Sequence, residues 1–328
     1  MRLLVTGGAG FIGSNFVRYV LGEDAGVRIV NLDALTYAGT LTSLHDLDDH
    51  PRHEFVHGDV CDPGLVDRLV RDADAVVHFA AESHVDRSID GPAAFLRTNV
   101  DGAGVVFEAA RRHGLERVLH ISTDEVYGSI DQGSFAEDDP LEPNSPYAVS
   151  KAAADLLARA YRVTYDFPIM VTRTTNNFGP YHFPEKMIPL FVTNLIQSRP
   201  VPLYGDGGNV RDWTYVLDNC EAQWRVLTRG TPGEVYNVGA GNELSNRELT
   251  LALLERLGLG EEMIEHVEDR PGHDRRYSVD TTRIRQLGWQ PRHDLDEALD
   301  ATIRWYRDNE WWWHPLIEAG AAARRGRA

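Results

Sequence analysis

The chain has 328 residues, of which 42% are hydrophobic and 25% are charged, as in ordinary folded globular proteins. Its 50 acidic and 33 basic residues give a net charge of −17, which argues against a broad binding surface for nucleic acid or for an anionic membrane. Cys61 and Cys220 are too few for a disulfide framework and have no metal-ligand spacing, and no apolar run resembles a membrane span or a signal peptide, so we expect a cytoplasmic protein without a metal site.

Over the first 174 residues, short apolar segments alternate with helical segments. Strands are expected over residues 2–6, 27–31, 54–57, 75–79, 117–122 and 169–173, and helices over residues 11–21, 63–70, 93–113 and 147–165. This alternation predicts an α/β fold, in which helices cover both faces of a doubly wound parallel sheet. Such sheets bind ligands in the crevice at the carboxyl ends of their strands, so we expect the site there.

After about residue 174 this alternation breaks. Glycine, proline and aromatic residues crowd residues 176–189 and 200–208, which predicts a loop-rich lid rather than more sheet. A helix is expected over residues 246–257, where Ser245 can cap the first turn and Glu248 can complete a capping box. The tail over residues 305–315 contains four of the seven tryptophans and is expected to pack against the body of the protein.

A glycine-rich segment connects the first strand to the first helix. Gly7, Gly10 and Gly13 are spaced three apart, and in a Rossmann-type fold this pattern permits a tight turn and a close approach of the backbone to a pyrophosphate. Asp33 follows 20 residues after Gly13 at the end of the second strand, where a carboxylate accepts hydrogen bonds from ribose hydroxyls and repels a 2′-phosphate. These residues predict NAD rather than NADP, with a turn or cap residue as the alternative for Asp33.

Tyr147 and Lys151 lie four residues apart in the helix expected after a proline-rich loop, so they share one face of that helix. A nearby ammonium lowers the pKa of a phenol, which can then take a proton from a substrate hydroxyl while NAD takes the hydride. Thr123, after the fifth strand, is expected to share the hydrogen bond. This spacing is common by chance, but Lys151 and Lys186 are the two lysines of an arginine-rich chain, which favours chemical roles for them.

Together, the glycine pattern and the Tyr147 and Lys151 pair resemble the extended short-chain dehydrogenase/reductase family, and within it the dTDP-glucose 4,6-dehydratases along nearly the whole chain. The resemblance rests on residues 6–14, 33–39, 80–88, 122–128, 176–189, 211–213, 270–274 and 309–315. It implies an NAD-binding Rossmann domain over residues 1–174, to which the chain returns around residues 212–240. Residues 175–328 are then mainly a smaller C-terminal α/β domain that binds a nucleotide sugar.

Asp124 and Glu125 form a pair of adjacent carboxyls directly after Thr123. A simple dehydrogenase or 4-epimerase needs a Tyr, a Lys and a Ser or Thr, whereas loss of water also needs an acid for the leaving hydroxyl and a base for a carbon-bound proton. Two carboxyls can supply both if their surroundings separate their pKa values. The alternative is a solvated turn, which is the weaker interpretation because the pair follows the fifth strand at the ligand edge of the sheet.

The resemblance implies an NAD-dependent hydro-lyase that converts dTDP-glucose to dTDP-4-keto-6-deoxyglucose. Tyr147 is expected to deprotonate the C4 hydroxyl while NAD+ receives the C4 hydride, and the new ketone acidifies C5. Glu125 then removes the C5 proton, Asp124 protonates the leaving C6 hydroxyl, and Glu125 reprotonates C5 as the hydride returns to C6. The cofactor is expected to stay tightly bound and to be regenerated in each turnover.

The same resemblance implies two sets of binding residues. For the cofactor these are Gly7, Gly10, Phe11, Ile12, Gly13, Asp33, Ala34, Leu35, Thr36, Asp59, Val60, Ala80, Ala81, Ser83, His84, Thr98, Tyr147, Lys151 and Asn177. For the substrate they are Ser83, Thr123, Asn176, Lys186, Met187, Pro202, Tyr204, Arg211, Asn246, Arg270 and His273. The guanidinium groups match phosphate oxygens in pairs, while phosphate binding and capping of a turn are equal alternatives for His273.

The predicted partner is the nucleotide sugar dTDP-glucose, with thymine rather than uracil implied by the resemblance alone. The resemblance also implies a homodimer in which the helices near residues 93–113 and 147–165 pair as a four-helix bundle. Two other functions stay open. One is another nucleotide-sugar enzyme of the same fold, such as a UDP-glucose 4,6-dehydratase or a 4-epimerase, and the other is a non-catalytic NAD-binding regulatory protein.

Overall fold

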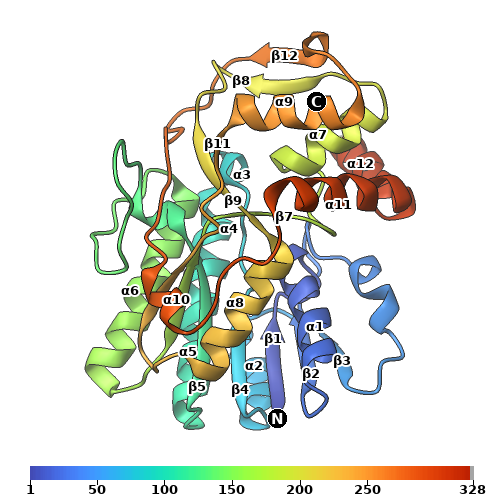
Figure 1. Cartoon of the computed structure of the whole chain (residues 1–328). Helices are drawn as coiled ribbons and strands as arrows, with labels where there is room; N and C mark the ends of the chain where they lie inside the picture. The colour runs from blue at the N-terminus through green and yellow to red at the C-terminus, as the bar shows by residue number, and fades with distance from the viewer. Residues whose placement is uncertain (326–328) are drawn as a thin grey trace.

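A parallel sheet of seven strands forms the centre of the larger, lower part of the molecule in Figure 1, a computed structural model that describes residues 1–325. Across the sheet the strands follow the order β10 (Val235–Val238), β6 (Met170–Thr174), β5 (Arg117–Thr123), β4 (Ala75–His78), β1 (Arg2–Thr6), β2 (Arg28–Asp33) and β3 (His53–His57). Every neighbouring pair is parallel. The predicted doubly wound α/β fold is therefore confirmed.

Apolar side chains that alternate along each strand bury both faces of this sheet. In β1, Leu3 and Val5 join one core cluster and Leu4 joins the other. The helices α1 (Phe11–Glu23) and α8 (Val216–Arg229) contribute to the first cluster, and α2 (Pro63–Arg71), α5 (Ala103–Arg112) and α6 (Pro146–Tyr165) contribute to the second. The β strands are thus fixed from both sides, and their carboxyl ends form a rigid edge for a site.

The helix predicted over residues 93–113 is confirmed, with a π-helical stretch in its middle that was not predicted. It consists of α4 (Pro92–Leu96), a π-helical stretch η2 (Arg97–Gly102) and α5. A Cβ added to Gly102 would lie 2.8 Å from Cγ2 of Val60, so glycine permits the close packing of η2 on the segment after β3. π-helical turns frequently occur at functional sites, and Thr98 of η2 does line the cavity described below. A short helix α3 (Val85–Asp90) precedes this unit and was not predicted.

The smaller, upper part of the molecule in Figure 1 contains more regular structure than the predicted loop-rich lid. Here the structure places β7 (Asn176–Phe178), β9 (Val210–Tyr215) and β11 (Glu243–Ser245) in one sheet, and β8 (Val201–Tyr204) and β12 (Ile264–Val267) in another. Glycine and proline hid these short strands, so the prediction of a lid without strands over residues 176–189 and 200–208 is wrong. The helical elements of the whole molecule that have not yet been named are η1 (Leu41–Leu47), η3 (Asp124–Tyr127), α7 (Met187–Ile196), α9 (Asn246–Leu257), η4 (Glu261–Met263), α10 (Thr282–Gln286), α11 (Leu295–Asp308) and α12 (Glu310–Arg325).

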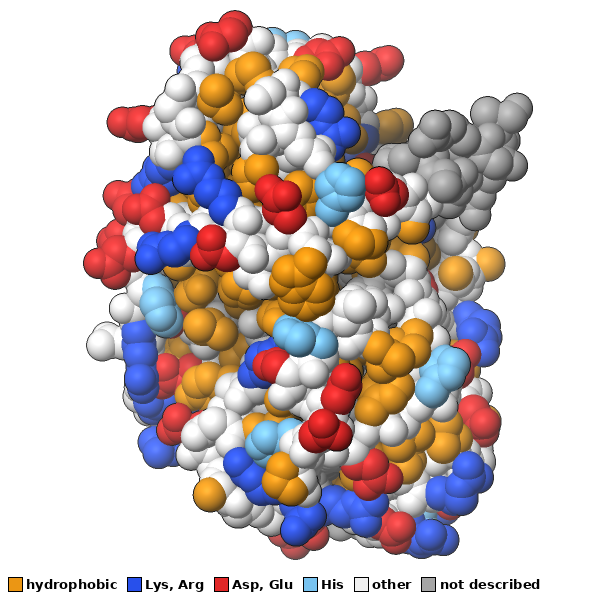
Figure 2. All heavy atoms as spheres, turned by 90° about the vertical axis from the view of Figure 1, so that its right-hand side faces the viewer, with side chains coloured by type: hydrophobic (Ala, Val, Ile, Leu, Met, Phe, Trp, Pro, Cys, Tyr) orange, Lys and Arg blue, Asp and Glu red, His pale blue; other side chains and the backbone are white. Residues whose placement is uncertain are grey.

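Two predictions for this smaller part are confirmed. The helix α9 begins and ends where predicted, with the reciprocal hydrogen bonds of the capping box between Ser245 and Glu248. In the tail, Trp312 and Trp313 are buried in the core cluster formed by α7, α9 and α11, although Trp311 is half exposed. Acidic and basic side chains are interspersed on the face shown in Figure 2. No helix within residues 1–325 combines the length and the apolar character needed to cross a membrane.

Candidate active site

A cavity of about 470 Å³ lies at the carboxyl ends of the central strands, where the large sheet meets the smaller part. Strand-end residues Gly7, Asp33, Thr123 and Thr174 line one side, and Lys186 from the segment before α7 lines the other. All five predicted catalytic residues line this single cavity. The expected location of the site, at the ligand edge of a doubly wound sheet, therefore agrees with the observed cavity.

One end of the cavity is formed by a tight turn in which glycines let backbone segments pack closely against each other. Gly7 has φ +74°, and a Cβ there would lie 2.6 Å from the backbone nitrogen of Ala80. A Cβ on Gly13 would lie 2.3 Å from the carbonyl oxygen of Gly7. Within the described chain no side chain caps α1 at Gly10, so the first backbone N–H groups of this helix have no side-chain acceptor there. This cradle fits the pyrophosphate of a dinucleotide.

The carboxylate of Asp33 organises the turn beside it and lines the cavity. Its Oδ2 accepts a hydrogen bond from the backbone of Ala9 and its Oδ1 accepts one from the backbone of Leu35, each at 2.8 Å. Burial raises the pKa of Asp33, and the two backbone hydrogen bonds act against that rise. Because each carboxylate oxygen has a second lone pair and the residue lines the cavity, Asp33 organises the turn and can also accept from ribose hydroxyls.

Tyr147 enters the cavity from the first turn of α6. The Ser145 hydroxyl accepts a hydrogen bond from the backbone of Ala148 (3.1 Å), and Pro146 occupies the first helical position, so the helix starts directly before Tyr147. Four residues later, Nζ of Lys151 donates to the carbonyl oxygen of Ile121 (2.6 Å). The sequence thus places the phenol and the ammonium on one helical face, as predicted.

The predicted fall in the pKa of Tyr147 is not found in this structure, because burial is the larger influence. Burial and the nearby charge of Glu125 raise the pKa of Tyr147, and a hydrogen bond with Thr123 acts against the rise. Burial also lowers the pKa of Lys151 to about 8, which leaves its ammonium only moderately stable at neutral pH. A phenolate at Tyr147 therefore needs further positive charge in the site beyond that of Lys151.

The adjacent carboxyls have different surroundings. Thr123 caps η3: its Oγ1 accepts from the backbone of Glu125 (3.3 Å) and donates to Oδ1 of Asp124 (3.2 Å). Burial and the charge of Glu125 raise the pKa of Asp124 well above its usual range. Burial also raises the pKa of Glu125, but three nearby cations act against this rise, namely Lys186, Arg270 and Arg211. Asp124 is therefore suited to donate a proton and Glu125 to accept one.

Several buried polar atoms of the cavity wall have no hydrogen-bond partner within residues 1–325. Four of them are Oδ2 of Asp124, Oγ of Ser122, Oδ1 of Asn176 and Oδ1 of Asn177. Leaving a buried polar atom unpaired costs about 1–3 kcal/mol, so a polar ligand that pairs with them gains that energy. These atoms lie beside the acid pair and the Tyr147 helix, where the nicotinamide and the sugar are predicted.

Some predicted binding residues lie outside the lining of this cavity: Leu35, His84, Pro202, Tyr204, Arg211, Asn246, Arg270 and His273. His84 instead precedes α3 and lies 4.0 Å from Glu185. Arg270 donates to Oδ1 of Asp86 (3.0 Å) and Nδ1 of His273 lies 2.7 Å from Oδ1 of Asp269. His273 thus contacts a carboxylate side chain, and both alternatives for it, phosphate binding and capping of a turn, stay predictions.

Comparison with known proteins gives the family of the chain. The family model described as GDP-mannose 4,6 dehydratase matches residues 4–302. The chain belongs to this family. It is 53% identical over 321 residues to a dTDP-glucose 4,6-dehydratase of Streptomyces niveus, and the alignment covers 96% of each chain. The predicted resemblance to the nucleotide-sugar epimerases and dehydratases is therefore confirmed.

Solved structures separate two branches of this fold. The crystal structure of DesIV, a dTDP-glucose 4,6-dehydratase from Streptomyces venezuelae with NAD bound, has a TM-score of 0.94 and 54% identity, covering 96% of this chain and all of the other. A UDP-glucose 4-epimerase from Thermotoga maritima has a TM-score of 0.87 and 28% identity, covering 94% of this chain and all of the other. The chain is thus more similar to the dehydratase.

The site also contains residues that we did not predict, including Tyr37, Glu82, His182 and Glu185. Arg87 connects two of them, because its guanidinium lies 3.9 Å from the ring centre of Tyr37 and donates to Glu185 (2.8 Å). All lie within the segments that carry the family resemblance, which is the signal that could have found them. Among residues 1–325 no cluster of His, Cys, Asp and Glu is suited to hold a metal ion.

Proposed function

We propose that this protein is a dTDP-glucose 4,6-dehydratase, an NAD-dependent hydro-lyase that converts dTDP-glucose to dTDP-4-keto-6-deoxyglucose. The observation that carries this proposal is the pair Asp124 and Glu125 in the same cavity as Tyr147. An oxidation at C4 needs only the phenol and its neighbours, whereas elimination of water also needs the acid and the base. The similarity to dehydratases over nearly the whole of both chains supports the choice.

The cofactor of this proposal is NAD+, which when bound accepts a hydride from C4 of the sugar and returns it to C6. The glycine cradle at Gly7 and Gly13 would hold its pyrophosphate, and Asp33 would accept hydrogen bonds from the adenosine ribose. The unpaired amide oxygen of Asn177 lies in the same wall as Lys151 and suits the nicotinamide end. The carboxylate of Asp33 would disfavour a 2′-phosphate.

In the proposed reaction each proton has a donor and an acceptor on the chain. Tyr147 acts as a phenolate, a form that the positive charge of Lys151 favours, and it becomes a phenol when it takes the proton of the C4 hydroxyl. The C4 ketone makes the C5 proton acidic, and Glu125 removes it. Asp124, whose protonated form is favoured by burial, donates a proton to the C6 hydroxyl, which leaves as water. Glu125 then returns the proton to C5.

The nucleotide end is proposed to lie beside the smaller part of the molecule. Glu125 has three cations near enough to influence its pKa, namely Lys186, Arg211 and Arg270. Their positive charge is therefore concentrated at the sugar end of the cavity, where it can meet the diphosphate of the substrate. We therefore infer that residues 1–174, with a return around 212–240, bind NAD+ and that the other residues mainly bind the nucleotide. Calorimetric titration tests this division: an Asp33 variant should lose NAD+ affinity and an Arg211 variant should lose affinity for thymidine diphosphate.

A substrate labelled with deuterium at C4 tests the proposed function directly. We expect the deuterium at C6 of the product, because the hydride removed from C4 returns to C6. An epimerase would return the label to C4, and a non-catalytic NAD-binding protein would leave the substrate unchanged. Parallel assays with dTDP-glucose and UDP-glucose, followed by nuclear magnetic resonance of the products, identify the preferred base.

A homodimer is also part of this proposal, supported by an apolar stripe on α6. Val149, Leu156 and Val163 are spaced seven residues apart and are 45%, 56% and 70% exposed. Leu96 of the neighbouring α4 is 49% exposed. We expect a dimer in analytical ultracentrifugation and a monomer for Leu156→Glu, because the charge would be buried in the interface. Leu41→Glu, at a residue 48% exposed in η1, should remain dimeric, and an unaltered protein that sediments as a monomer would contradict the proposal.

We further infer that the protein works in the cytoplasm. This inference is supported by Cys61 and Cys220, which are both free thiols. Disulfides are rare in reducing compartments, so free thiols suit that location. Cell fractionation tests it, and recovery in an extracytoplasmic fraction would contradict it.

A further inference from the structure

A chain of buried polar side chains joins α6 to η3, the two elements that carry the proposed acid and base groups. Asp155 follows Lys151 by four residues and lies on the same face of α6. Arg173, in β6, donates from Nε to Oδ2 of Asp155 (2.8 Å) and from Nη1 to the hydroxyl oxygen of Tyr127 (2.7 Å). Because Tyr127 is the last residue of η3, a single guanidinium spans both elements.

The side chain of Tyr127 is fixed on every side. It is 1% exposed, and its hydroxyl donates to Oδ1 of Asn237 (2.8 Å) while it accepts from Arg173. Its ring stacks on Phe135 with the centroids 4.9 Å apart, and the guanidinium carbon of Arg173 lies 4.8 Å from the ring centre. These contacts fix both the plane of the ring and the direction of the hydroxyl.

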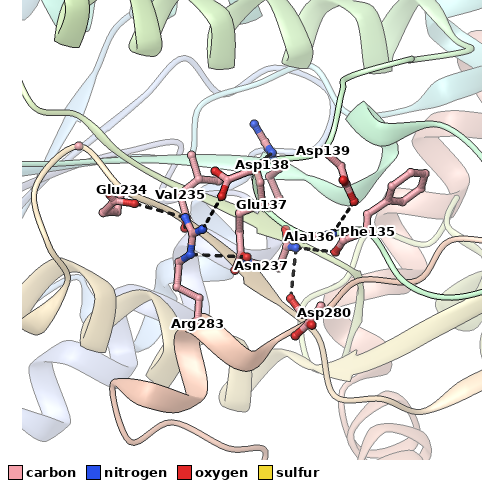
Figure 3. A network of polar contacts seen from close by, with 12 residues as sticks. Phe135, Ala136, Glu137, Asp138, Asp139, Glu234, Val235, Asn237, Asp280 and Arg283 are labelled. Atoms are coloured by element: carbon pink, nitrogen blue, oxygen red, sulfur yellow. Dashed lines mark hydrogen bonds and ion pairs between the residues drawn. The ribbon is translucent and has the colours of Figure 1, made fainter.

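Asn237 is itself anchored outside the cavity (Figure 3). Its backbone N–H donates to Oε1 of Glu137 (3.0 Å), and its amide donates to the carbonyl oxygens of Phe135 (2.9 Å) and Asp280 (3.2 Å). Arg283 holds the same group together, since its guanidinium lies 3.6 Å from Oε2 of Glu137. The anchor of Tyr127 therefore belongs to β10 and the segments packed beside it.

We propose that Arg173 and Tyr127 are positioning residues that set the distance between Tyr147 on α6 and Glu125 in η3. Arg173, Tyr127 and Asp155 all lie outside the lining of the cavity, so they act through the elements that they join. A buried ion pair such as Arg173 and Asp155 adds little to the stability of the fold, because the cost of desolvating both charges offsets their attraction. Its fixed geometry is the property that an acid–base site needs.

This inference rests on the proposed function, because it concerns two proton transfers at neighbouring carbons of one sugar. Oxidation at C4 uses Tyr147 and Lys151, which α6 holds without help from η3. Removal of the C5 proton also requires Glu125 at the correct distance from a sugar already held at Tyr147. If the link is broken, C4 oxidation therefore continues while C5 deprotonation slows, and reduced cofactor accumulates on the enzyme.

Tyr127→Phe tests the proposal, since it removes the hydroxyl link and keeps the stacked ring. We expect kcat to fall between about tenfold and about 10²-fold with little change in KM. We also expect a larger reduced fraction of bound cofactor during turnover and slower exchange of the C5 proton with solvent. Tyr236→Phe is the matched control, because that hydroxyl accepts from the backbone of Thr231 (2.8 Å) beside the same sheet; this variant should behave as the unaltered enzyme.

Arg173→Lys provides the second variant. The ammonium of lysine keeps a positive charge beside Asp155, but it lacks the planar guanidinium that donates to both Asp155 and Tyr127. Both changes break one link, so the double variant should lose no more kcat than the worse single variant. Losses that multiply would overturn the proposal, as would a normal kcat for Tyr127→Phe or an equal loss of C4 oxidation and C5 exchange. Thermal unfolding checks that each variant is folded. If Tyr127→Phe is unfolded, the ratio of the rate of C4 oxidation to the rate of C5 exchange is taken from Arg173→Lys. Failure of the unaltered enzyme to form the 4-keto-6-deoxy product would instead count against the proposed function.

Discussion

The Glu125→Gln variant is expected to reduce its bound cofactor with dTDP-glucose and then stall, with turnover about 10²- to 10⁴-fold below normal. Glutamine keeps the size of the side chain but cannot accept the C5 proton. Tyr147 and Lys151 are unchanged, so oxidation at C4 should persist. A single-turnover experiment that follows the absorbance of the reduced cofactor measures the first step, and deuterium exchange at C5 measures the second.

A control and a second carboxyl variant make this result specific. Glu243→Gln alters a glutamate that is paired with Arg276 (2.8 Å) outside the cavity, and it should behave normally. Asp124→Asn should slow loss of water but keep C5 exchange, because the base is still present. Normal C5 exchange in Glu125→Gln would remove Glu125 from the role of base.

The rate of C4 oxidation in the unaltered enzyme is expected to rise with pH and to level off above about 8, the value to which burial lowers the pKa of Lys151. Below this pH the side chain is an ammonium, which favours a phenolate at Tyr147. Above it the neutral amine gives no such help, and this loss offsets the growing phenolate fraction of Tyr147, so the rate of C4 oxidation should stop rising. Lys151→Met removes the charge at every pH and should lower this step about 10²- to 10⁴-fold.

Single-turnover reduction of the bound cofactor, measured across a pH series, checks this prediction. The levelling above pH 8 should be absent from Lys151→Met, because no ammonium remains to lose its proton. Circular dichroism of each sample separates a loss of chemistry from a loss of fold. If the rate for Lys151→Met levels off at the same pH, another group is responsible for the levelling.

The spacing of apolar residues and the residue types in the turns made the part of the fold that contains the large sheet predictable from sequence. The strands of the large sheet are apolar on both faces and are separated by helices, a pattern that few other folds share. The strands of the smaller part are short, and Pro202 and Gly205 lie in or beside β8, so local sequence argued against them. The π-helical η2 was also hidden, since its residues continue a helical pattern on both sides.

The site was predictable where chemistry depends on local spacing and less so where it depends on distant contacts. The spacing of Tyr147 and Lys151 put both on one face, but the burial that raises the pKa of Tyr147 comes from the whole cavity. The link from Arg173 to Tyr127 joins residues 46 positions apart, and no spacing rule indicates it. Arg270 was predicted as a phosphate ligand, yet its contact with Asp86 could be found only in the structure.

That contact between Arg270 and Asp86 joins residues 184 positions apart, one in α3 and one in the loop after β12. In the proposed function the guanidinium receives the diphosphate, so each arriving nucleotide must displace a resident carboxylate. Affinity then reflects an exchange of anions instead of the full strength of a new ionic contact. Substrate and product bear the same diphosphate, so the exchange lowers the affinity for both equally. It therefore favours release of the finished sugar nucleotide and leaves the energy barrier of the chemical steps unchanged.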